Sequence, residues 1–118
     1  PLRLAIDDTA SGRLAASERE FDLARELRPW DPAVSATAAH AYATLAADGI
    51  AAAVAPGMRW ATRELDAFPR NVQALTDAAT LELAAGHAPA GRSLLARALA
   101  LEPRNPVLQH LWLASLAH

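Results

Sequence analysis

The chain offers few residues with which to perform catalysis, and it has no cysteine, glycine-rich phosphate loop or nucleophile elbow. Its histidines are His40, His87, His110 and His118. No two of them lie four residues apart, the spacing at which a helix turn can present two imidazoles to a metal ion. Asp7 and Asp8 are adjacent, but successive helix residues point about 100° apart, so the two cannot share a substrate. We therefore predict a domain that is not an enzyme, with no catalytic residue, cofactor or metal site.

The composition limits the class of partner. All 11 basic residues are arginines, and with 13 acidic residues they give a formal net charge of −2 at pH 7. Because nucleic acids and acidic membrane surfaces attract concentrated positive charge, which the chain lacks, we expect neither as a partner. No apolar run reaches the roughly 18 to 20 residues that span a bilayer, so we expect no direct membrane contact by this segment. Arginine without lysine and abundant alanine are typical of a GC-rich bacterial genome.

The elements that must position any functional residue are helices. Alanine, the strongest helix former, is abundant, and runs of the residues that favour strands are missing. Apolar residues recur at three- and four-residue steps over residues 2–10, 13–28 and 92–101. With 118 residues the chain suits one core rather than two, so we predict a single all-α domain over residues 1–118. Because it begins at Pro1, within a helical pattern, we expect it to be a piece of a longer protein.

One pattern of residues recurs before two prolines. Counting back from Pro29, the chain has a glycine, a small residue, a large apolar residue, an alanine and a leucine, and the same order at the same distances precedes Pro103. The matched pairs are Gly12 and Gly86, Ser17 and Gly91, Phe21 and Leu95, Ala24 and Ala98, and Leu27 and Leu101. A similar break follows at Pro69, and Asp31, Asn71 and Asn105 are placed to cap the helices that come next. A helical hairpin therefore repeats along the chain.

This order of residues resembles the tetratricopeptide repeat (TPR), a helix-turn-helix unit of 34 residues, which is also the distance from Pro69 to Pro103. The first helix of such a unit carries a small residue followed by an aromatic. Ala5, Ala39 and Ala79 supply the small residue, but only Tyr42 supplies the aromatic, with Asp8 and Glu82 at the equivalent positions. The resemblance implies an α-solenoid of three antiparallel helical hairpins in a right-handed superhelix, with a C-terminal capping helix. The units would span residues 1–31, 32–71, 72–105 and 106–118.

The middle unit is six residues longer than the 34-residue period, because Pro69 lies 40 residues after Pro29. We expect both of its helices to be about one turn longer than their neighbours. Pro56 leaves two alternatives for the second helix. Either a helix over residues 50–67 is kinked at Pro56, or a loop extends to Ala55 and Pro56 occupies the first turn of a new helix.

The end helix, residues 106–118, is apolar on nearly every side, so we expect it to be covered on two faces. One face can pack on the preceding hairpin. The other would be covered by a following helix of a longer protein or by a second copy of the chain. The residues predicted for this self-association are Leu108, Trp112 and Leu116.

The TPR resemblance also implies that the first helix of each unit lines a concave inner face, where a partner would bind. The predicted partner-binding residues are His40, Thr44, Gln73, Thr76, Thr80 and His110. This face lacks the Lys, Asn and Arg with which some TPR domains hold the C-terminal carboxylate of a chaperone, so we do not expect a chaperone adaptor. His40 is central on it. The alternative for His40 is a half-buried residue that bonds to a neighbouring helix.

We therefore expect a non-catalytic interaction or scaffold module that binds a peptide or a protein domain on its concave face. The alternative is the soluble C-terminal tail of a bacterial membrane glycan polymerase or ligase of the O-antigen ligase type, since such proteins often end in TPR-like helices with a turn similar to residues 27–32. The first would be cytoplasmic by default and the second extracytoplasmic. A third alternative is self-assembly through the end helix, as a homodimer.

Overall fold

The computed structural model describes residues 14–28 and 31–117. In that part of the chain the fold is all-helical and has no strand, which confirms the predicted class. The α-helices are α2 (Leu14–Leu27), α3 (Pro32–Ala47), α4 (Val54–Ala67), α5 (Val72–Ala84), α6 (Ala88–Leu101) and α7 (Pro106–Ser115), and the short 3-10 helix η1 (Ala51–Ala53) precedes α4. The helix predicted over residues 2–10 and the turn at Pro29 and Trp30 lie outside the described residues.

Local chemistry sets the ends of the helices. The side chains of Asp31, Asn71 and Asn105 accept hydrogen bonds from backbone N–H groups in the first turns of α3, α5 and α7, as the sequence predicts for N-caps. Gly49 and Gly86 follow α3 and α5 with φ angles of 92° and 83°, a left-handed conformation that favours glycine. The chain therefore turns back after each of these helices.

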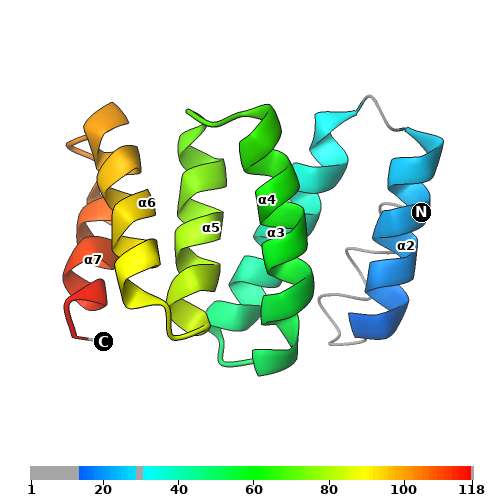
Figure 1. Cartoon of the computed structure of the whole chain (residues 1–118), viewed down its shortest axis with the longest axis horizontal. Coiled ribbons are helices and arrows are strands. Elements are labelled where there is room, and N and C mark those ends of the chain that lie inside the picture. The colour runs from blue at the N-terminus through cyan, green and yellow to red at the C-terminus, as the bar shows by residue number, and fades with distance from the viewer. Residues whose placement is uncertain (1–13, 29–30, 118) are drawn as a thin grey trace.

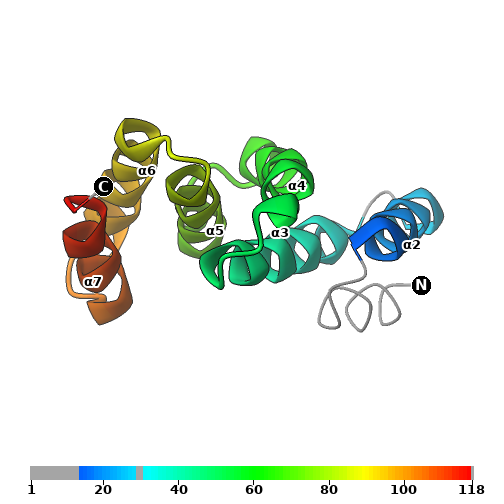
Figure 2. The ribbon, with the colours of Figure 1, turned by 90° about the horizontal axis from the view of Figure 1, so that it is seen from below.

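Each helix packs chiefly on its neighbours in the sequence. α2 contacts α3, α4 lies against α3 and α5, α6 lies against α5 and α7, and α3 also contacts α5. Figure 1 shows the helices side by side, with α2 and α7 at opposite ends of the row. In Figure 2, α3 and α7 lie on one side of the ribbon and α4 and α6 on the other. Over the described residues the helices therefore form a row.

The buried side chains form two clusters along this row. In the first, Phe21 of α2 lies 5.7 Å from Tyr42 of α3 and 5.9 Å from Trp60 of α4, measured between ring centroids. Leu75, Leu95 and Leu108 of α5, α6 and α7 belong to the second cluster. Alanine is common to both clusters, and the large buried side chains are mainly aromatic in the first cluster and leucine in the second.

The additional residues of the middle unit lie in α3 and η1. α3 has 16 residues against 13 in α5, whereas α4 and α6 have 14 each. The prediction of a longer helix was therefore right for α3 and wrong for α4. Pro56 occupies the first turn of α4, where its missing N–H costs no hydrogen bond of the α-helix, as the second alternative predicts. The loop that this alternative extends to Ala55 is wrong, because η1 covers residues 51–53 and α4 begins at Val54.

One buried hydrogen bond links α2 to α3 and allows a test of this packing. Ser17 Oγ donates to the Leu14 carbonyl at 2.9 Å and lies 2.8 Å from Tyr42 Oη, so the tyrosine hydroxyl is the donor to Ser17. We expect Tyr42→Phe to lower the free energy of unfolding by about 1 kcal/mol in urea denaturation. In a Ser17→Ala background the same change should cost nothing, because the hydroxyl has already lost its acceptor. Equal costs in both backgrounds would contradict this hydrogen bond.

Candidate functional site

The structure brings five of the six predicted partner-binding residues together in one groove. His40 and Thr44 come from α3, and Gln73, Thr76 and Thr80 come from α5. The groove has a volume of about 340 Å³, and we call it the α3–α5 groove. Its other lining residues are Ala43, Ala47, Asp48, Asp77, Val107 and Leu111. The helical spacing of the five residues therefore places them on one surface, with α7 contributing two apolar side chains at its edge.

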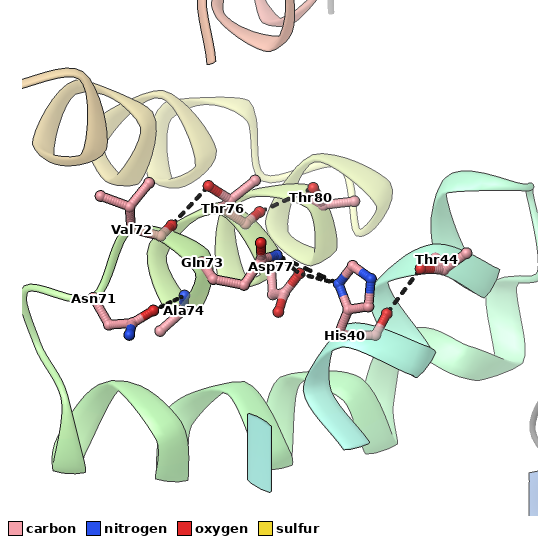
Figure 3. Close-up of polar contacts among 9 residues, drawn as sticks. All are labelled: His40, Thr44, Asn71, Val72, Gln73, Ala74, Thr76, Asp77 and Thr80. Atoms are coloured by element: carbon pink, nitrogen blue, oxygen red, sulfur yellow. Dashed lines mark hydrogen bonds and ion pairs between the residues drawn. The ribbon is translucent and has the colours of Figure 1, made fainter. Parts of the chain in front are cut away.

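A polar cluster lies at the centre of the groove (Figure 3). His40 Nδ1 lies 3.0 Å from Asp77 Oδ1, and Gln73 Nε2 donates to the same oxygen at 2.9 Å. The His40 side chain is 63% exposed and that of Asp77 is 4% exposed. A buried carboxyl group therefore orients an exposed imidazole, and this hydrogen bond joins α3 to α5. The predicted alternative for His40 is right about the bond to a neighbouring helix and wrong about half-burial.

The environment of Asp77 favours its neutral form. Burial raises the pKa of the Asp77 carboxyl above its ordinary value, because a carboxylate loses hydration inside the protein. The hydrogen bond and the charge of His40 act in the opposite direction, as does the hydrogen bond from Gln73. Burial therefore disfavours the Asp77 carboxylate, and its contacts with His40 and Gln73 partly compensate.

The three threonines of the groove turn their hydroxyl hydrogens back to their own helices. Thr44 donates to the His40 carbonyl at 2.9 Å, Thr76 to the Val72 carbonyl at 2.7 Å and Thr80 to the Thr76 carbonyl at 2.9 Å (Figure 3). Each hydroxyl thus has its single donor occupied and presents only lone pairs to a ligand.

A second buried carboxyl group, that of Glu64 on α4, interacts electrostatically with Asp77 and His40. Glu64 is 4% exposed, and no described residue donates to its Oε1 or to Asp77 Oδ2. Burial, with a further contribution from the charge of Asp77, raises the pKa of Glu64 to about 7, while the charge of His40 opposes the shift. Glu64 stands five residues before Pro69, whereas alanines, Ala24 and Ala98, stand five residues before Pro29 and Pro103. Glu64 is therefore an ionisable group at a position that a small apolar residue fills in the other two units.

Sequence reasoning named neither Asp77 nor Glu64. A signal for both is present in the sequence, since each falls on the apolar face of a predicted helix. Asp77 follows Leu75 and precedes Ala78 and Ala79, all of them buried, and Glu64 breaks the repeated alanine. A charged residue among buried apolar ones is rare without a partner, so this pattern could have indicated a polar cluster.

The structure separates the remaining predicted residues. His110 is exposed on α7 and does not line the groove, where Val107 and Leu111 lie instead. Leu108 is 1% exposed and packs in the second cluster with Leu75 and Leu95, so the prediction that placed it on a surface open to a second copy is corrected. The reason is that α6 packs against this side of α7, where Leu108 joins the cluster that contains Leu95 and Leu75.

The other two residues predicted for self-association lie differently. Trp112 is half-buried against the second cluster, and Leu116 is 58% exposed. Of the three, Leu116 is therefore the residue most available to another molecule.

The described residues were also compared with the requirements of a metal site and of a membrane-spanning helix, and the sequence with known proteins. Within residues 14–28 and 31–117, no three His, Asp or Glu side chains converge as a metal site would require. No helix in the same part of the chain has the length and apolar character needed to cross a bilayer. No protein-family profile matches the sequence, and no curated protein is significantly similar to it.

Proposed function

We propose that this domain is a non-catalytic protein-interaction module whose binding surface is the α3–α5 groove, in a TPR-like solenoid. The observation that carries the proposal is the gathering of His40, Thr44, Gln73, Thr76 and Thr80 in one groove, from two helices that are far apart in sequence. Polar side chains that are held in place on a surface bind a partner at a small cost in side-chain entropy.

The packing of the helices supports the solenoid. Helices contact chiefly their sequence neighbours, and Phe21 and Leu95 belong to different clusters rather than to one shared centre. Gly57 and Gly91 occupy the small-residue position of their units, and a Cβ at either would come within 3 Å of a side chain of the facing helix. The TPR resemblance implies that helices cross closely at these two positions.

The groove favours binding over catalysis. The threonine hydroxyls that could act as nucleophiles donate to backbone carbonyls, and His40 Nδ1 is engaged with Asp77. A hydroxyl becomes a nucleophile when a base accepts its proton, and here each threonine hydroxyl keeps its proton and donates a hydrogen bond to a backbone carbonyl, which is not a base.

Affinity capture with the full chain tests the proposal. We expect Thr76→Arg and His40→Ala each to lose proteins that the unchanged chain captures, since both residues line the groove. Two matched controls lie outside the groove. Thr62 of α4 is exposed and, like Thr76, donates to a carbonyl four residues earlier. His87 is 66% exposed and bonded to a carboxylate, Glu82.

The controls Thr62→Arg and His87→Ala should keep the captured proteins. Circular dichroism would confirm that all four variants remain helical. If the groove variants and the control variants capture the same proteins in the same amounts, the groove is not the binding surface.

A further inference from the structure

The outer face of α7 is uncharged and exposed. Leu113 is 66% exposed, and Leu116, at the end of the helix, is 58% exposed. Gln109 stands one helix turn before Leu113 and is also exposed. We call these three residues the outer face of α7. None of them lines the α3–α5 groove, so an interaction at this face goes beyond the proposed function.

A comparison with α5 shows what kind of element covers such a face. An asparagine side chain caps both α5 and α7, so residues 34 positions apart stand at the same distance from a cap. Gln109 and Leu113 therefore occupy on α7 the positions of Leu75 and Ala79 on α5. Leu75 and Ala79 are fully buried, and α6 packs on this side of α5, where a Cβ at Gly91 would lie 3.3 Å from the Ala79 carbonyl oxygen. The outer face of α7 is thus the face that a helix covers on α5.

The opposite side of α7 agrees with this comparison. Ser115 is buried, as is its counterpart Leu81. Leu81 lies against Gly57 of the preceding helix α4, and the Ser115 carbonyl accepts a hydrogen bond from Arg92 Nη1 of the preceding helix α6 at 3.2 Å. α5 and α7 therefore turn the same side to the helix before them. They differ in that no described helix covers the outer face of α7.

The size of Leu113 limits how closely a helix can cover this face. Alanines, Ala39 and Ala79, stand at the equivalent positions of α3 and α5, eight residues after the caps, and both are fully buried. The crossing of α5 and α6 is close, since a Cβ at Gly91 would lie 2.8 Å from Leu83 Cγ. Because leucine is larger than alanine, a helix on α7 must lie further away than α6 lies from α5, with Leu113 between the two helices. A second α7 satisfies this requirement, because its own Leu113 fills the remaining space beside the first.

The charge of this region also favours a second copy. Residues 105–117 contain no Asp, Glu, Lys or Arg. In a two-fold contact each residue approaches its own counterpart, so a charged face would repel itself, whereas this face does not. Gln109 carries both a donor and an acceptor, so it can hydrogen-bond to the same residue of the other copy. A charged partner would meet no charge of opposite sign on this face.

We propose that two copies of the chain associate through the outer faces of their α7 helices, with Leu113 close to the two-fold axis. One helix face from each copy is smaller than the standard interface of about 800 Å² per partner, so we expect a weak dimer, with a dissociation constant on the order of 100 µM. Sedimentation equilibrium of the full chain between about 10 µM and about 1 mM measures this association. The weight-average mass should rise with concentration from that of one chain toward that of two.

Substitutions at Leu113 locate the contact. Leu113→Asp should keep the chain monomeric over this range, since a carboxylate from each copy would then meet at the axis. The matched control is Leu23→Asp, at an exposed leucine of α2, and it should associate as the unchanged chain does. An equimolar mixture of Leu113→Asp and Leu113→Arg should associate more strongly than either variant alone, because opposite charges then face each other. Circular dichroism would confirm that the variants remain helical.

Several outcomes would overturn the inference. One is a constant mass of a single chain up to about 1 mM, and another is association of Leu113→Asp equal to that of the unchanged chain. Growth beyond two copies would also contradict it, since a two-fold contact closes at a dimer. A mixture that associates no more than its separate variants would show that the two Leu113 side chains do not meet.

Discussion

Replacing Phe21 by alanine should lower the free energy of unfolding by about 3 to 5 kcal/mol, measured by urea denaturation of the full chain. Phe21 is fully buried and its ring contacts both Tyr42 and Trp60, so its removal leaves a cavity among three helices. Since domains are stable by about 5 to 15 kcal/mol, the loss is a large part of the total. Phe21 is the largest of the three side chains that α2 buries, the others being Ser17 and Ala24.

Leu23→Ala is the matched control for Phe21→Ala. Leu23 lies on the same helix and is 42% exposed, so its truncation removes fewer contacts and should cost less than about 1 kcal/mol. Phe21→Leu should fall between the two, because leucine fills part of the cavity. A cost for Phe21→Ala no greater than that for Leu23→Ala would contradict the aromatic cluster.

The second large effect is a loss of stability as the pH rises, which Glu64→Gln should remove. The pKa of Glu64 is raised from 4.5 to about 7 in the folded chain. The folded state therefore holds a proton that the unfolded state releases at lower pH, and its stabilising effect is complete below about pH 4.5. This contribution is lost as the pH rises through about 7. With about 1.4 kcal/mol for each unit of pKa, we expect the free energy of unfolding to fall by about 2 kcal/mol between pH 5 and pH 8.

Glutamine keeps the shape of glutamate and cannot ionise, so Glu64→Gln should be more stable than the unchanged chain at pH 8 and similar to it at pH 5. Urea denaturation at the two pH values measures both. Asp77 of α5 and His40 of α3 are the titratable groups that act on Glu64, and the raised pKa of Asp77 adds to the same trend. Glu26→Gln, at an exposed carboxyl on α2, is the control and should keep the pH dependence. A Glu64→Gln variant with the full pH dependence would show that Glu64 is not its origin.

The two buried carboxyl groups, Glu64 and Asp77, affect the stability of the fold, and Asp77 also lines the α3–α5 groove. Burying a carboxylate without a full set of donors destabilises a fold, and the equivalent positions Ala24 and Ala98 show that the repeat accommodates alanine where Glu64 stands. The charge of Asp77 adds to the effect of burial in raising the pKa of Glu64, since two carboxylates repel each other.

The sequence by itself determined the helices and most of their ends. Asp31, Asn71 and Asn105 were identifiable as N-caps, because a cap depends on residues within one turn. The inner-face positions of α3 and α5 were also predictable, because three- and four-residue spacing places side chains on one face of a helix whatever surrounds it. The TPR resemblance named the five groove residues, and helical spacing accounts for those of each helix sharing one face.

Tertiary structure alone decided which faces are covered and which polar groups meet. The helical pattern of residues 106–118 is apolar nearly all round, so it could not show that Leu108 would be buried and Leu116 exposed. Asp77 and His40 are 37 residues apart, and their contact depends on how α3 lies against α5. Helix periodicity is a property of a few neighbouring residues, whereas burial and pKa depend on the helices that pack around each side chain.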